Sequence, residues 1–171
     1  MNKNKNTIFS VVIILLFVGG LVLLAGPGKK ETANIADSSG GGSSVLPITL
    51  TEKSFDFGTI SMTKGTVFHD FKILNSAAEA FVVKKMYTSC MCTNASLITA
   101  SEKVGPFGMM GHGFVPEIDV PITAGEEASV RVVFNPAAHG PAGVGRIERS
   151  VYLENNAGAP VEIKISATVT P

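Results

Sequence analysis

Residues 160–169 read PVEIKISATV, and this stretch decides the fold class of the chain. Val161, Ile163, Ile165 and Ala167 occupy every second position, and polar residues stand between them. Strict alternation of apolar and polar residues is typical of a β-strand with one buried face. The last part of the chain therefore contains at least one half-buried strand.

The same period of two recurs through the sequence that precedes this strand. Residues 128–134 read ASVRVVF, and similar segments cover residues 55–60, 67–75, 80–88 and 149–156. Segments rich in Gly, Pro and Asn separate them, as turns between strands require. The pattern predicts an all-β fold over residues 45–171, an immunoglobulin-like β-sandwich of about seven strands without an amphipathic helix. The residues expected in its core are Phe57, Phe71, Val132, Phe134 and Ile163.

The N-terminal part of the chain has a different composition. Residues 7–25 read TIFSVVIILLFVGGLVLLA, nineteen residues without a charge, and as a helix they span about 28 Å of the roughly 30 Å hydrocarbon core of a membrane. Lys3 and Lys5 precede this segment, which favours a cytoplasmic N-terminus. The sequence thus predicts a cytoplasmic stretch at 1–6 and a single transmembrane signal-anchor at 7–25 in the cytoplasmic membrane, with the rest of the chain on the extracytoplasmic side. A cleaved signal peptide is the alternative, although its apolar stretch is ordinarily shorter.

Residues 26–44 form a Gly- and Ser-rich segment without apolar periodicity, which predicts a flexible linker. Residues 45–171 hold ten Lys and Arg against twelve Asp and Glu, so a nucleic-acid partner is not expected. No nucleophile elbow, zinc-protease motif or phosphate-binding loop occurs in the sequence. We therefore expect a protein that is not an enzyme.

Several short segments, taken in order, resemble a known family. These are FDFGTI (55–60), VFHDFKILN (67–75), SCMCT (89–93), PITAGEEASVRVVFNP (121–136) and a last strand that ends in ISATV (165–169). The ordered set resembles the bacterial domain-of-unknown-function family 1573, which is related to the immunoglobulin-like major-sperm-protein and ASPM–SPD-2–Hydin domains. The hallmark of that family is S-C-G-C-T, and Met91 replaces its central glycine here. The resemblance implies an immunoglobulin-like fold and a location in the cell envelope, but no activity.

Cys90 and Cys92 are the two cysteines of the chain and the centre of the candidate site. If they end an extended strand, both thiols point to one side with Cα atoms about 6.6 Å apart, near the upper limit for a disulfide. Three readings stay open: structural or disulfide-linked cysteines, a soft-metal site, and a thiol redox pair. Met109, Met110 and His112 follow in a glycine-rich segment and offer two thioethers and an imidazole.

Thiolate, thioether and imidazole ligands together suit Cu(I). The sequence therefore predicts a metal site formed by Cys90, Cys92, Met109, Met110 and His112, with His139 as an ordinary loop residue. The functional prediction is a membrane-anchored module for binding or assembly in the bacterial envelope. An envelope protein is the expected partner, and copper a candidate ligand. The alternatives are an extracytoplasmic thiol–disulfide redox protein and a purely structural spacer.

Overall fold

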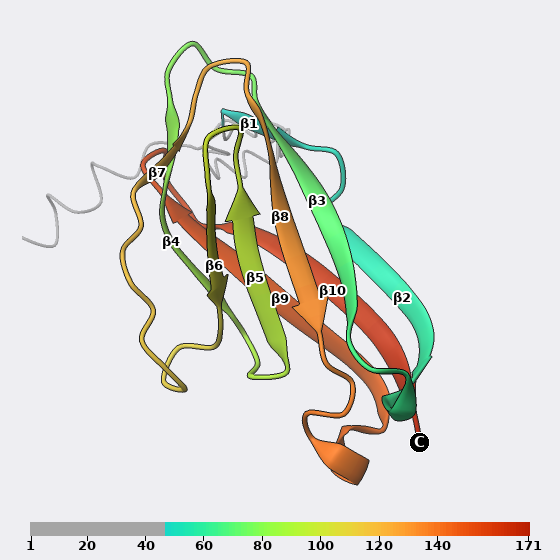
Figure 1. Ribbon diagram of the computed structural model, residues 1–171. Helices are drawn as coiled ribbons and strands as arrows, with labels where there is room; N and C mark the ends of the chain where they lie inside the picture. Colours follow the sequence, from blue (N-terminus) through green and yellow to red (C-terminus); the bar gives the residue numbers. More distant parts are fainter. Residues whose placement is uncertain (1–46) are drawn as a thin grey trace, which may run out of the picture. The chain divides into compact units, whose positions relative to one another are not determined.

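The computed structural model describes residues 47–171, which fold into two five-stranded β-sheets (Figure 1). The strands are β1 (Ile48–Leu50), β2 (Ser54–Ser61), β3 (Val67–Asn75), β4 (Phe81–Thr88), β5 (Thr93–Ile98), β6 (Lys103–Phe107), β7 (Val120–Ile122), β8 (Glu127–Phe134), β9 (Gly145–Asn155) and β10 (Val161–Thr170). Two short 3-10 turns, η1 (Met62–Lys64) and η2 (Gly140–Gly143), lie between strands. The described residues contain no α-helix, so the all-β prediction is confirmed.

The first sheet has the order β1-β3-β8-β5-β6 and is antiparallel throughout. The second has the order β2-β10-β9-β4-β7, and only its β2–β10 pair is parallel. Short strands account for the difference between the ten strands found in residues 47–171 and the seven expected. β1 and β7 have three residues each, too few to show a period of two.

The core lies between the sheets and is built by the alternation seen in the sequence. Along β8 and β10 every second side chain is buried. Phe71, Val132, Phe134 and Ile163 are buried as expected, each with 2% or less of its surface exposed. Phe57 is only half-buried and packs against the edge of the core.

The connection from β4 to β5 carries the chain from one sheet to the other. It does so at one end of the sandwich, where Thr93 of β5 lies opposite Phe134 and Phe134 lies opposite Val67. β1 pairs with the other end of β3, since Ile48 lies opposite Asn75. The first described strand and the β4–β5 connection are therefore at opposite ends of the sandwich (Figure 1).

The predicted cytoplasmic stretch, transmembrane anchor and linker, residues 1–44, lie outside the described residues. Within residues 47–171 no helix is long and apolar enough to cross a membrane.

Candidate functional site

Cys90 and Cys92 lie in the turn between β4 and β5, and their sulfur atoms are joined as a disulfide. The backbone N–H of Thr93 donates to the carbonyl oxygen of Cys90 at 3.1 Å, which closes a tight turn around Met91. The Cα atoms of the two cysteines are therefore 5.3 Å apart, within the ordinary range for a disulfide. The expectation of an extended strand end with a Cα separation of about 6.6 Å is wrong, because the chain turns here to change sheets.

Hydrogen bonds to both sheets hold this cysteine turn (residues 89–92) in place. Oγ1 of the buried Thr88 lies 3.0 Å from the carbonyl oxygen of Cys90 and 2.9 Å from that of Thr93. Ser89 exchanges two hydrogen bonds of 2.9 Å with the backbone of Ser150 on β9. The turn is thus a rigid support for the two sulfur atoms.

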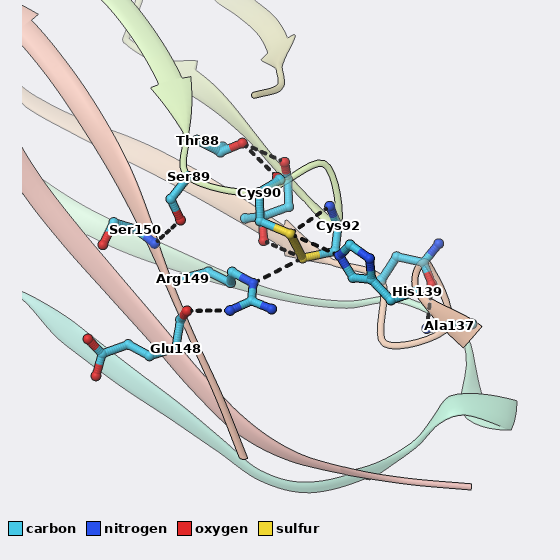
Figure 2. Close-up of a disulfide and its surroundings, with 11 residues drawn as sticks. Thr88, Ser89, Cys90, Cys92, Ala137, His139, Glu148, Arg149 and Ser150 are labelled. Carbon is cyan, nitrogen blue, oxygen red and sulfur yellow. Dashed lines mark hydrogen bonds between the residues drawn. A yellow bond between two sulfur atoms is a disulfide. The ribbon is translucent and has the colours of Figure 1, made fainter. Parts of the chain in front are cut away.

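Two side chains from distant parts of the sequence contact the sulfur atoms (Figure 2). Nε2 of His139 lies 3.1 Å from Sγ of Cys90. Nε of Arg149 donates to Sγ of Cys92 at 3.3 Å, and its Nη1 donates to the carbonyl oxygen of Glu148 at 2.7 Å. The sulfur atoms therefore lie among nitrogen groups, although both cysteines are largely buried, with 8% of Cys90 and 2% of Cys92 exposed.

The register of the sheets explains why these two residues reach the sulfurs. The N–H of Asn135, which directly follows β8, donates to the carbonyl oxygen of Cys92 at 2.8 Å, so the loop after β8 begins beside the cysteine turn. The Asn135 side chain accepts from the N–H of Ala137 at 3.0 Å, which starts the bend toward His139. The position of Arg149 follows from the pairing of β4 with β9. This pairing places Thr88 opposite Val151, and Arg149 lies two residues before Val151 on the same strand.

The structure distributes the predicted metal ligands differently from the sequence expectation. Ligand atoms of Cys90, Cys92 and His139 all lie within 4.8 Å of one another, and they form the one such group of Cys, His, Asp and Glu found in residues 47–171. His112 is not in this group and lies on an exposed loop, as does Met110. The imidazole beside the sulfurs is thus that of His139, because the loop after β8 rather than the loop after β6 ends next to them.

Met109 differs from the exposed Met110 and His112. It is half-buried, and its backbone forms a bridge with Thr88, two residues before Cys90. The segment that carries the two methionines therefore starts near the cysteine turn.

A cleft of about 350 Å³ opens beside His139 and Arg149. Its walls come from the loop that holds η2 and from the first part of β9, and they include His139, Val144, Arg146, Glu148 and Arg149. Both residues that contact the sulfurs thus also line the cleft. A small molecule in the cleft would contact the two side chains that touch the sulfurs, although the cysteines themselves do not line it.

Several solved structures are similar to this chain at low sequence identity. A protein of unknown function from Porphyromonas gingivalis W83 has a TM-score of 0.51 and 15% identity, covering 71% of this chain and 46% of that one. The secreted serine protease VesC from Vibrio cholerae follows with a TM-score of 0.48 and 9% identity over 74% of this chain and 24% of that protein. The ASH/PapD-like domain 7 of human CEP192 has a TM-score of 0.43 and 12% identity over 85% of this chain and 94% of that domain.

The chain spans less than half of the first two of these proteins. At 15% identity the likeness to the first concerns the fold alone. A search among curated proteins finds no match. Residues 48–117, which include the cysteine turn, match the family described as "Protein of unknown function (DUF1573)". The family resemblance predicted from the sequence motifs is thereby confirmed as a match over this part of the chain.

Proposed function

We propose that this protein is a binding module of the bacterial envelope that holds one Cu(I) ion between Cys90, Cys92 and His139 when its disulfide is reduced. The observation that carries the proposal is the mutual distance of the three ligand atoms, all within 4.8 Å of one another. Atoms this close can share one metal ion after small shifts of their side chains. The rigid cysteine turn reduces the entropy lost when the ion binds.

The donor set favours a soft ion. Two thiolates and an imidazole suit Cu(I), whereas Mg²⁺ and Ca²⁺ prefer oxygen ligands. Zinc is the nearest competitor, since thiolate and imidazole are its usual ligands as well. A Cu(I) ion between two thiolates leaves one net negative charge, and the guanidinium of Arg149 beside Cys92 offsets it. A divalent zinc ion would leave no such charge, so Arg149 favours Cu(I).

We further propose that residues 7–25 anchor the chain in the cytoplasmic membrane and that the β-sandwich lies on the extracytoplasmic side. The support is the uncharged length of this segment and the lysines before it. A reporter fused after Pro171 that is active only after export should be active. Activity of a reporter that works only in the cytoplasm would refute this orientation.

The metal proposal is tested by competition for copper. The full chain, reduced and kept in detergent, should retain one equivalent of Cu(I) against a chromogenic Cu(I) chelator. Cys90→Ser and Cys92→Ser should each lose it. Equal copper retention by the wild type and the double cysteine variant would exclude the site and favour a structural spacer, in which the cysteines affect stability alone. Retention of zinc but not copper under the same conditions would also contradict the proposal.

A further inference from the structure

Arg149 differs from the two other arginines of the chain in its partners. Arg131 and Arg146 each form an ion pair with an aspartate, Asp70 and Asp56. Within residues 47–171 Arg149 has no carboxylate partner within ion-pair distance, and its guanidinium faces Sγ of Cys92 and the carbonyl oxygen of Glu148 instead. A half-buried cation without an anionic partner can pair with an anion that binds or forms nearby.

Two anions can meet this cation. One is the thiolate of Cys92, which forms when the disulfide opens, because a neighbouring cation stabilises a thiolate. The other is an anionic group in the cleft of about 350 Å³, which Arg149 lines together with His139, Arg146 and Glu148. Arg146 and Glu148 are already paired, with Asp56 and Lys164, so Arg149 is the cation left for a bound anion. The cleft lies within the size range of small-molecule sites. His139 and Arg149 contact the sulfurs as well as the cleft, so these two side chains connect a bound molecule to the disulfide.

We infer that this cleft binds small thiols that carry a carboxylate and that such a thiol reduces the Cys90–Cys92 disulfide. The inference concerns the oxidised, metal-free protein and goes beyond the proposed copper function. The carboxylate would lie toward the guanidinium groups, and the sulfur of the thiol toward the disulfide. The apolar side chain of Val144 at the cleft offers a contact for the carbon chain between these two groups.

The reaction takes two steps of thiol–disulfide exchange. In the first, the thiolate of the small molecule attacks Sγ of Cys90, the less buried of the two cysteines, and the Cys90–Cys92 bond breaks. Cys92 leaves as a thiolate next to Arg149, and the small thiol is joined to Cys90 in a mixed disulfide. In the second, another small thiolate attacks the small-molecule sulfur of that bond, and Cys90 leaves as a thiolate beside His139.

Two small thiols are thus oxidised to one disulfide, and the protein gains two electrons as two cysteine thiolates. The protons of the two small thiols pass to the solvent or to the cysteine sulfurs. The product is the reduced protein with both sulfurs free.

The test compares two thiols on the oxidised, metal-free full chain: 3-mercaptopropionate, which carries a carboxylate, and 2-mercaptoethanol, which carries none. Disulfide opening is followed by alkylation and mass measurement at a series of thiol concentrations. For each variant the rate constant for 3-mercaptopropionate is divided by that for 2-mercaptoethanol. This ratio is compared with the wild-type ratio, so that differences in reactivity between the two thiols cancel. Arg149→Gln should lower this ratio about fivefold, which corresponds to one close charge pair in water-like surroundings. The same variant should slow both thiols, because Cys92 loses its cation as a leaving group.

The control is Arg131→Gln, which removes an arginine that pairs with Asp70 on the other sheet and should leave the ratio unchanged. An unchanged ratio in Arg149→Gln would overturn the inference. If that variant does not fold, added salt replaces it, since screening should reduce the ratio for the wild type. A ratio insensitive to salt would also overturn the inference. Neither readout involves copper, so a failed copper titration and a failed exchange test are distinguishable.

Discussion

Nε2 of His139 lies 3.1 Å from Sγ of Cys90, although 49 positions separate the two residues in the sequence. The contact exists because the chain segments after β8 and before β5 meet at the same end of the first sheet. It changes the composition of the candidate metal site, since the imidazole comes from the loop around η2 (Gly140–Gly143) rather than from the methionine-containing segment.

Replacing this histidine should weaken copper binding. His139→Ala removes one of three close ligands, and we expect the Cu(I) affinity of the reduced protein to fall by at least about tenfold, the effect already typical of losing an outer partner of a metal ligand. Chelator competition measures the change. His112→Ala is the matched control, because His112 lies on an exposed loop, and it should leave the affinity unchanged. A loss of Cu(I) affinity in His112→Ala but not in His139→Ala would contradict this prediction and support the ligand set expected from the sequence.

The core should depend strongly on Phe134, which is 2% exposed on β8. Phe134→Ala removes a buried ring between the sheets, and the free energy of unfolding should fall by about 3–5 kcal/mol. Urea denaturation followed by circular dichroism gives this value. Phe114→Ala makes the same chemical change at a side chain that is 90% exposed, so it should change the stability by no more than about 0.5 kcal/mol. Similar losses in both variants would contradict the placement of Phe134.

Gly105 on β6 should not tolerate a side chain. Its φ of +103° is unfavourable for other residues, and a Cβ there would lie 2.9 Å from the carbonyl oxygen of Ala95 on β5. Gly105→Ala should therefore lower the stability by more than about 1 kcal/mol. Gly113→Ala places a methyl group where no atom lies within 4 Å and should be nearly neutral. Equal midpoints of urea denaturation for the two variants would show that β6 does not pack in this way.

The stability of the domain should depend on pH through Asp70. Two hydrogen bonds from the Arg131 guanidinium, at 2.8 and 2.7 Å, hold the pKa of this carboxyl below its ordinary value of 3.8. The folded state then binds the proton less readily than the unfolded state, so the contribution is present above the ordinary pKa and is lost as the pH falls through the lowered one.

Arg131→Gln should therefore lower the free energy of unfolding at pH 7. The difference from the wild type should disappear as the pH falls below about 4. Unfolding curves at a series of pH values measure the difference between variant and wild type. Lys84→Gln breaks an exposed ion pair with Asp119 and serves as the control, with a small difference from the wild type. A difference for Arg131→Gln that stays constant down to pH 2 would contradict the assignment.

Strands with a regular period of two could be predicted from the sequence, and short ones could not. β8 and β10 each bury alternate residues along their length, which makes them visible as a pattern. β7 has the sequence VPI, and its proline argues against a strand unless the strand lies at the edge of a sheet, where β7 indeed lies. The parallel pairing of β2 with β10 could not be predicted from the sequence either, because it depends on how the chain enters the second sheet.

The two cysteines of the candidate site could be predicted from the sequence, but the side chains that contact their sulfur atoms could not. Two cysteines separated by one residue are evident from the sequence, whereas His139 and Arg149 reach them only through the pairing of β5 with β8 and of β4 with β9. Those pairings contain the one usable signal. If the start of β5 lies opposite the end of β8, the residues just after Phe134 are neighbours of the cysteine turn, and His139 becomes a candidate. A disulfide between Cys90 and Cys92 was among the open alternatives, and its ordinary Cα separation follows from the turn.

β1 and the disulfide lie at opposite ends of the sandwich. β1 pairs with the Asn75 end of β3, and the cysteine turn lies beyond the other end, eight residues away along β3 and so about 27 Å from it. The first described residues thus lie at the end of the sandwich remote from the sulfurs. A partner that binds the sandwich at its β1 end therefore leaves the cysteine turn uncovered.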